Sequence, residues 1–266
     1  MVDTHCHLFI SDYPDIDEVI KKMGDNIMIV SGVDDDSNRE VLELCSRYDN
    51  VYGTLGIHPE EASNSYNLDF VRNHINDSKI VAVGEIGLDY YYTKENKDKQ
   101  IDLFCKQIEI ALEFNKPIVV HSRDAISDTY NIIKKYNIGN KTDIHCFSGS
   151  LEMAKEFVKL GCKLGIGGVL TFKNAERLKD VVRSIDISNL LLETDSPYMT
   201  PVPFRGKRNE PYNIFYVAQE IADLKGMLID EVLEITKKNS FNLFDFRKWF
   251  VVWYSRFIRE VEYDIF

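Results

Sequence analysis

The sequence predicts an α/β fold, a TIM-type (β/α)₈ barrel built as one domain. Three observations support this prediction. Eight short apolar runs alternate with longer amphipathic segments along the chain. The 266 residues match the roughly 250 residues that such a barrel needs. No low-complexity stretch or linker divides the chain.

The apolar runs are predicted to be strands because they are rich in Val, Ile and Leu and lack interior Pro, as parallel strands buried on both faces do. They occupy residues 1–7, 27–32, 51–57, 80–86, 117–121, 143–147, 163–167 and 190–194. Amphipathic helical segments lie between them, for example at residues 100–115 and 151–160. An open doubly wound sheet shows the same alternation, but eight units within 266 residues favour the closed barrel.

The barrel is expected to span residues 1–245, with a C-terminal extension at 246–266. The extension contains both tryptophans, Trp249 and Trp253, beside Phe250. We expect a terminal amphipathic helix packed on the barrel; the alternative is a contact with another subunit or a membrane surface. Deleting residues 247–266 should then alter solubility or association more than chemistry. The expected oligomeric state is a monomer or a weak oligomer.

Charge, cysteine content and hydropathy argue against several classes of protein. The net charge of −11 argues against a broad cationic surface for duplex nucleic acid, because phosphate binding needs Lys and Arg to displace counterions. The five cysteines are odd in number and form no C-x-x-C pair, which argues against a disulfide framework or a zinc knuckle. No run approaches the roughly 20 apolar residues of a membrane helix, and no signal peptide is visible, so a cytoplasmic location is expected.

The histidines point to a common site. Five of the six lie at or just after predicted strand ends, and only His74 falls in a helical segment. The five are His5, His7, His58, His121 and His145. A barrel gathers the carboxyl ends of its strands at one face, where active sites form. The pattern therefore predicts one cluster of imidazoles at the mouth of the barrel.

The motif His5-Cys6-His7 suggests what these imidazoles do. Residues i and i+2 of a strand point to the same side, so both imidazoles face the interior while Cys6 faces the helices. Two neutral imidazoles on one face can chelate a metal ion. Core histidines satisfied by hydrogen bonds are the alternative, but the shared position of His121 and His145 on successive strand ends argues against it.

Carboxylates at other strand ends are further candidate metal ligands. Glu85 ends the fourth predicted strand, and its two oxygens could bridge two cations; a salt-bridged buried Glu is the alternative. Asp195 ends the eighth, and we assign it to metal binding and to the attacking water. Glu193 lies two residues earlier, and we expect it to orient the site or bind substrate. Asp3 shares the face of His5 and could accept a hydrogen bond from an imidazole that binds the metal.

Four imidazoles, Glu85 and Asp195 make six protein ligands, which exceeds the three or so that a catalytic zinc uses. The number suits two divalent cations about 4 Å apart that stabilise the attacking and leaving oxygens of a phosphoryl displacement. The mixed donors allow Zn²⁺, Mn²⁺ or Mg²⁺, and the imidazoles favour transition metals. The cations are therefore predicted to be held by His5, His7, Glu85, His121, His145 and Asp195.

Taken together, the motifs resemble those of the TatD family of metal-dependent hydrolases. The matching segments are residues 3–7 (DTHCH), 56–60 (GIHPE), 84–89 (GEIGLD), 121–123 (HSR), 145–149 (HCFSG), 193–197 (ETDSP) and 205–211 (RGKRNEP). The resemblance implies an amidohydrolase-like barrel and divalent-metal-dependent cleavage of DNA phosphodiesters, with 3′→5′ exonuclease action in some members. It also implies that His58 and Arg205 contact the substrate phosphate.

The resemblance further implies how the ligands divide. His5, His7, Glu85 and Asp195 would hold one cation, and Glu85, His121 and His145 the other. Two alternatives remain at this point. One is a binuclear amidohydrolase acting on a C–N bond or a small phosphoester; the other is a metal-binding module without catalysis. Glu85, at the place where many binuclear amidohydrolases carry a modified Lys, and the cationic loop around Arg205 favour the phosphodiesterase.

Overall fold

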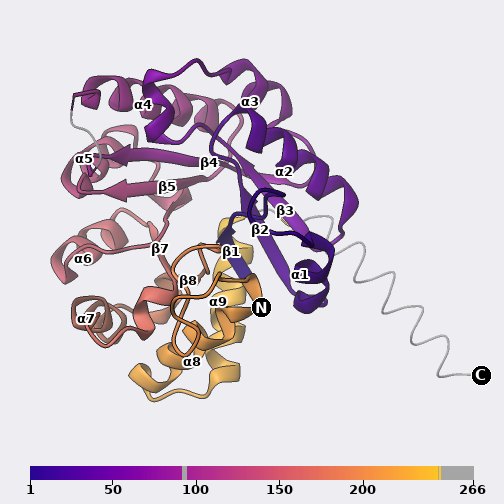
Figure 1. Ribbon diagram of the computed structural model, residues 1–266. Helices are drawn as coiled ribbons and strands as arrows, with labels where there is room; N and C mark the ends of the chain where they lie inside the picture. Colours follow the sequence, from indigo (N-terminus) through magenta and orange to yellow (C-terminus); the bar gives the residue numbers. More distant parts are fainter. Residues whose placement is uncertain (92–94, 245, 247–266) are drawn as a thin grey trace, which may run out of the picture.

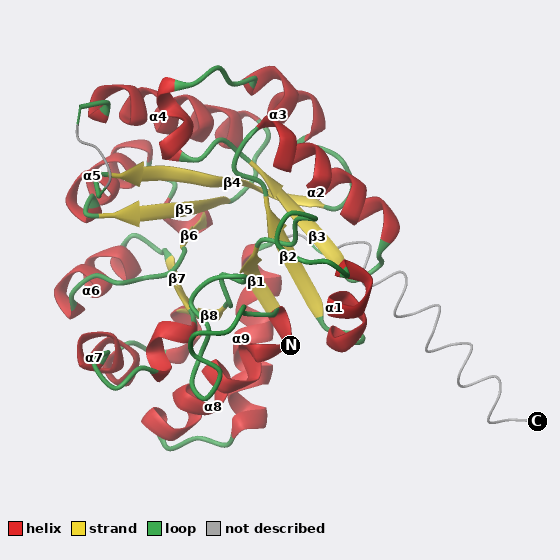
Figure 2. Ribbon diagram, in the orientation of Figure 1, coloured by secondary structure: helices red, strands yellow, loops and turns green. Residues whose placement is uncertain are grey.

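The computed structural model confirms the barrel, and it describes residues 1–91, 95–244 and 246. Eight parallel strands pair in chain order, each with the next. They are β1 (Val2–Cys6), β2 (Ile27–Ser31), β3 (Val51–Leu55), β4 (Ile80–Asp89), β5 (Ile118–Arg123), β6 (Thr142–Ile144), β7 (Lys163–Ile166) and β8 (Leu190–Leu192). Figure 2 shows the strands on the inside, surrounded by helices.

The two ends of the sheet meet just beyond β8. The amide of Asp195 donates to the carbonyl of His5 at 3.0 Å, and the amide of His7 donates to the carbonyl of Ser196 at 2.7 Å. These hydrogen bonds join the segment after β8 to β1. The barrel is therefore closed at the carboxyl ends of its strands, where the predicted site residues lie.

The α-helices of the described residues cover the outside of the barrel (Figure 1). They are α1 (Ile16–Met23), α2 (Asp35–Arg47), α3 (Leu68–His74), α4 (Lys97–Glu113), α5 (Ile126–Tyr136), α6 (Leu151–Lys159), α7 (Glu176–Ser184), α8 (Ile214–Lys225) and α9 (Ile229–Leu243). Local capping fixes where several begin: at α2, the side chains of Asp34 and Ser37 each accept a hydrogen bond from the other's backbone amide. None of the helices described is both long and apolar enough to cross a membrane.

Apolar side chains fill the other end of the barrel. One buried cluster consists of Val2, Ile27, Ile29, Tyr52, Val81, Ala82, Val119, Leu191, Phe244 and Phe246. Most of these residues lie among the first three residues of a strand, so they form the floor beneath the polar mouth. Phe246 packs edge-on against Tyr52, with ring centroids 4.9 Å apart. The first residue of the expected extension thus belongs to the barrel floor; residues 247–266 lie outside the described part, and their expected helix stays a prediction.

The strands near the site differ in length from the sequence prediction. β4 continues to Asp89 and β5 to Arg123, because residues 86–89 pair with residues 120–123. β8 instead ends at Leu192, and Asp195 has a φ of +52°, a conformation that Asp tolerates better than most residues. Strand alternation therefore does not orient Glu193 and Asp195, and each carboxylate has its own direction.

Candidate metal centre

The structure places Glu85 at the centre of the predicted cluster. This carboxylate on β4 is 3% exposed. Its Oε2 lies 3.2 Å from Nε2 of His5 and 3.5 Å from Nε2 of His7. Its Oε1 lies 3.0 Å from Nδ1 of His121 and 3.6 Å from Nε2 of His145. The two oxygens thus face two different pairs of imidazoles.

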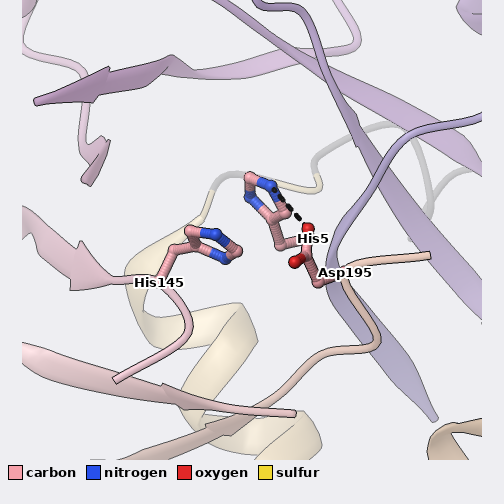
Figure 3. Close-up of side chains that lie close together, drawn as sticks. All are labelled: His5, His145 and Asp195. Carbon is pink, nitrogen blue, oxygen red and sulfur yellow. Dashed lines mark ion pairs between the residues drawn. The ribbon is translucent and has the colours of Figure 1, made fainter. Parts of the chain in front are cut away.

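Asp195 faces the first pair. Its Oδ1 lies 3.5 Å from Nε2 of His7 and 3.9 Å from Nε2 of His5. The rings of His5 and His145 stack with centroids 3.7 Å apart. Figure 3 shows these two imidazoles beside the carboxylate of Asp195, on three different parts of the chain. The structure therefore brings together all six residues predicted to bind metal.

Each of the four imidazoles has its outer nitrogen next to a hydrogen-bond acceptor. Nδ1 of His5 lies 3.1 Å from Oγ of Ser31, and Nδ1 of His7 donates to the carbonyl of Ser31 at 3.0 Å. Nε2 of His121 and Nδ1 of His145 face the carboxylates of Asp89 and Glu193, as described below. When a ring is neutral and carries its proton on the outer nitrogen, its inner nitrogen keeps a lone pair toward Glu85.

This arrangement fits divalent cations. The inner nitrogens of the imidazoles lie close to the oxygens of Glu85 and Asp195. Buried imidazoles whose other nitrogen is hydrogen-bonded to an acceptor are typical of metal sites. Within the described residues, ligand atoms of three sets lie within 4.8 Å of one another. The sets are His5 with His145 and Asp195, His5 with His7 and Glu85, and His58 with Glu85 and His121.

His58 differs from the other imidazoles. Its Nε2 lies 3.7 Å from Oε1 of Glu85, so it borders the cluster. However, its Nδ1 accepts a hydrogen bond from the amide of Glu60 at 3.3 Å. The proton of a neutral ring then sits on Nε2, which makes His58 a donor rather than a ligand. The expected contact of His58 with a substrate phosphate stays a prediction.

Glu193 contacts His145 from below. It is fully buried, its Oε1 accepts from the amide of Cys146 at 2.8 Å, and its carboxylate lies 3.3 Å from Nδ1 of His145. A Cβ at Gly165 would come within 2.2 Å of Glu193 Oε2, so the absence of a side chain there leaves room for the carboxylate. These contacts favour an orienting role for Glu193.

Asp89 is a site residue that the sequence did not single out. Its Oδ2 lies 2.9 Å from Nε2 of His121, and its Oδ1 accepts from the amide of Tyr91 at 2.9 Å. The carboxylate is 2% exposed. Asp89 follows Glu85 by four residues, and residues separated by an even number on a strand point to the same side. This spacing indicates a site residue only once β4 is known to extend to Asp89.

Asp3 contacts Thr194 and the backbone of His5, and Arg205 contacts Phe172. Asp3 accepts hydrogen bonds from the amide and hydroxyl of Thr194, at 2.9 and 2.6 Å, and so ties β1 to the segment after β8. The structure thus corrects the expectation that Asp3 supports an imidazole, because Ser31 does so. Arg205 lies on the exposed loop after β8, and its guanidinium is 4.2 Å from the ring centroid of Phe172.

Comparison with known proteins identifies the family. The family model described as TatD related DNase matches residues 2–245. The chain belongs to the TatD family. It is 41% identical to the metal-dependent hydrolase YabD of Bacillus subtilis, over 92% of this chain and 98% of that protein. It is 37% identical to the metal-dependent hydrolase YcfH of Escherichia coli, over 92% and 95%.

Solved structures agree with the TatD assignment. The TatD homologue YjjV of Escherichia coli superposes with a TM-score of 0.85 at 30% identity, covering 92% of this chain and 98% of that one. An organophosphorus hydrolase from Deinococcus radiodurans superposes with a TM-score of 0.59 at 15% identity, covering 91% and 92%, which shows the shared fold alone. The chain is therefore a metal-dependent hydrolase of the TatD family with an amidohydrolase-like barrel.

The charges of this TatD centre are mutually dependent. Burial raises the pKa of Glu85, but the imidazoles of His5 and His145 outweigh it and hold that pKa well below its usual value. Burial lowers the pKa of His121, but hydrogen bonds to Asp89 and Glu85 outweigh it and raise that pKa to about 9. Burial dominates at His58, whose pKa falls to about 3. His58 is therefore neutral near pH 7, as its hydrogen bonds require.

Metal affinity should rise with pH. Without a cation, His121 keeps its proton until the pH approaches its pKa of about 9, and a cation must displace that proton to bind. The apparent association constant should therefore increase at least about tenfold per pH unit between about pH 6 and 9, because His121 alone must lose one proton. Competition titrations with a chromogenic zinc chelator would measure it, and an affinity that is flat over this range would contradict the prediction.

Proposed function

We propose that this chain hydrolyses phosphodiester bonds of DNA and holds two divalent cations to do so. The single observation that carries the proposal is the position of Glu85, whose two oxygens face separate pairs of imidazoles at 3.0–3.6 Å. A buried carboxylate so placed can bridge two cations, which is an arrangement suited to phosphoryl displacement. The family assignment supports this substrate class.

The residues divide around Glu85. His5, His7 and Asp195 would hold the first cation, and His121 and His145 the second. When bound, the cations supply Lewis-acid stabilisation of the attacking and leaving oxygens. Asp89 and Glu193 keep the second pair of imidazoles in the tautomer that such binding needs.

The chain's other groups act on water and phosphate. Asp195 accepts the proton of the attacking water. Its pKa is lowered because the hydrogen bond from His7 and the neighbouring imidazoles outweigh burial, so the carboxylate is ionised at neutral pH. His58 donates its Nε2 proton to a phosphate oxygen. Arg205 holds the phosphate from the loop after β8, where barrels often bind phosphate.

Metal analysis coupled to a substrate panel tests the proposal. Elemental analysis after reconstitution should approach two ions per chain, and a saturating value of one would exclude the two-cation arrangement. The panel should contain single-stranded DNA, small phosphodiesters and amides, each with Mg²⁺, Mn²⁺ and Zn²⁺. Cleavage of amides with inert phosphodiesters would instead establish the C–N hydrolase alternative.

Arg205→Ala should weaken the reaction without removing metal. A charged hydrogen bond contributes roughly 1.5–3 kcal/mol, so kcat/KM on phosphodiesters should fall about tenfold to a hundredfold. Steady-state kinetics and metal content would be measured on the same preparation. Arg177→Ala, on the exposed surface of α7, is the matched control. Unchanged kinetics in Arg205→Ala would remove this residue from the site.

A further inference from the structure

Tyr198 lies beside the metal centre and is not used by the proposed chemistry. It follows Asp195 by three residues, and its amide donates to the carbonyl of Asp195 at 2.8 Å. Its own carbonyl accepts from Nδ2 of the buried Asn209 at 2.7 Å. The backbone that carries the ring is therefore fixed to the segment that supplies the proposed base.

The ring of Tyr198 is both close to the centre and open to solvent. It lies edge-to-face with His7, with ring centroids 6.2 Å apart, yet the residue is 57% exposed. After burial, the main causes of its raised pKa are Asp12 and Asp195. The hydroxyl therefore stays neutral, and the ring presents an aromatic surface at the mouth of the barrel.

A second exposed tyrosine stands across the mouth. Tyr91 follows β4 and is also 57% exposed. Its amide donates to Asp89, the carboxylate that contacts His121. Because β4 and β8 are four places apart in a ring of eight strands, the loops after them lie on opposite sides of the mouth. The guanidinium of Arg123 lies 3.7 Å from the ring centroid of Tyr91, so this side also carries a cation.

We propose that Tyr198 stacks on the nucleobase next to the scissile phosphate. Tyr91 and Arg123 contact the nucleotide on the other side of that phosphate. The inference rests on the proposed function and names how that site recognises its substrate. Each base has a flat π-face, so such stacking tolerates any sequence. It also accounts for how a chain of net charge −11 can hold DNA without a broad cationic surface.

Chemical removal of the base tests the inference. Cleavage would be compared for a short oligothymidylate and an oligomer of the same length made of abasic tetrahydrofuran nucleotides. Stacking on one base is worth roughly a tenfold to hundredfold change in affinity. Tyr198→Ala should lower kcat/KM by about this factor on oligothymidylate, mainly through KM, and leave the abasic oligomer unaffected. Tyr198→Phe should behave as the wild type on both.

Binding provides a readout that does not depend on turnover. Fluorescence anisotropy would measure both labelled oligomers on metal-loaded chains that carry Asp195→Asn, with and without Tyr198→Ala. Tyr136→Ala is the matched control, because Tyr136 ends α5 on the segment that leads to the start of β6, at the floor end of the barrel. Preference for the base-bearing oligomer should disappear in the Tyr198→Ala chain and persist in the control.

The outcomes separate the two proposals. An equal loss on both oligomers, or no loss on either, would overturn the stacking role while leaving DNA hydrolysis intact. A wild-type chain that neither binds nor cleaves either oligomer would overturn the proposed function, and the stacking role with it.

Discussion

Glu85→Gln should lose both cations and at least about 10⁴-fold of activity. The amide keeps the size of the side chain but removes the charge that faces His5 and His7 on one side and His121 and His145 on the other. A bound metal ion lowers the pKa of water from near 16 to about 7, so its loss removes most of the nucleophile at neutral pH. No other change to one residue should affect both proposed cations equally.

Elemental analysis, kinetics and thermal unfolding of Glu85→Gln would measure this result. Glu43→Gln, on the exposed face of α2, makes the same chemical change away from the site and should behave as the wild type. A Glu85→Gln chain that keeps two ions would show that Glu85 is not their common ligand. If it keeps one ion, Glu85 serves a single cation and the two-cation arrangement needs another bridge.

The barrel could be predicted because its signals are local. Eight apolar runs, their spacing and the chain length suffice to predict (β/α)₈, and the structure confirms eight parallel strands in chain order. The ends of the strands were less predictable. The extension of β4 to Asp89 depends on pairing with β5, where Gly87 lies opposite His121. Such register is a property of two distant segments, and neither segment shows it alone.

The candidate ligands were predictable for a related reason. The carboxyl ends of all barrel strands meet at one mouth, so the positions of His5, His121 and His145 at strand ends sufficed to predict that they lie close together. The groups behind them were not predictable in this way. Ser31 and Asp89 contact imidazoles on neighbouring strands, and that contact depends on register and side-chain direction. The sequence therefore predicts which residues surround the cations better than what orients them.

The contacts of Arg205 could not be predicted from its position in the sequence. Its place in a cationic loop after β8 predicted a phosphate contact, and the structure places its guanidinium over the ring of Phe172. A long exposed side chain can reach several partners, and its resting contact depends on which aromatic face lies nearest. The stacking on Phe172 restricts the guanidinium, so the proposed contact with a phosphate would cost less conformational entropy.

Asp195→Asn should slow hydrolysis by at least about 10²–10⁴-fold while the barrel and the cation at His121 and His145 remain. General-base assistance contributes about this much. Asp195 is 8% exposed, and the lowered pKa that follows from its hydrogen bond with His7 keeps it ionised at neutral pH. The amide of Asn can still offer an oxygen to a cation, but it cannot take a proton from water. The loss should therefore appear in kcat more than in KM.

Metal content must be measured in the same Asp195→Asn sample, because loss of an ion would imitate loss of a base. Asp69→Asn, on the exposed first turn of α3, is the matched control. An Asp195→Asn chain with two ions and near wild-type turnover would refute Asp195 as the base. Glu193 would be the next residue to test, although its oxygens lie within 3.3 Å of the amide of Cys146 and of His145 Nδ1. In that case Glu193→Gln, with its ions retained, would show the loss in kcat that Asp195→Asn does not.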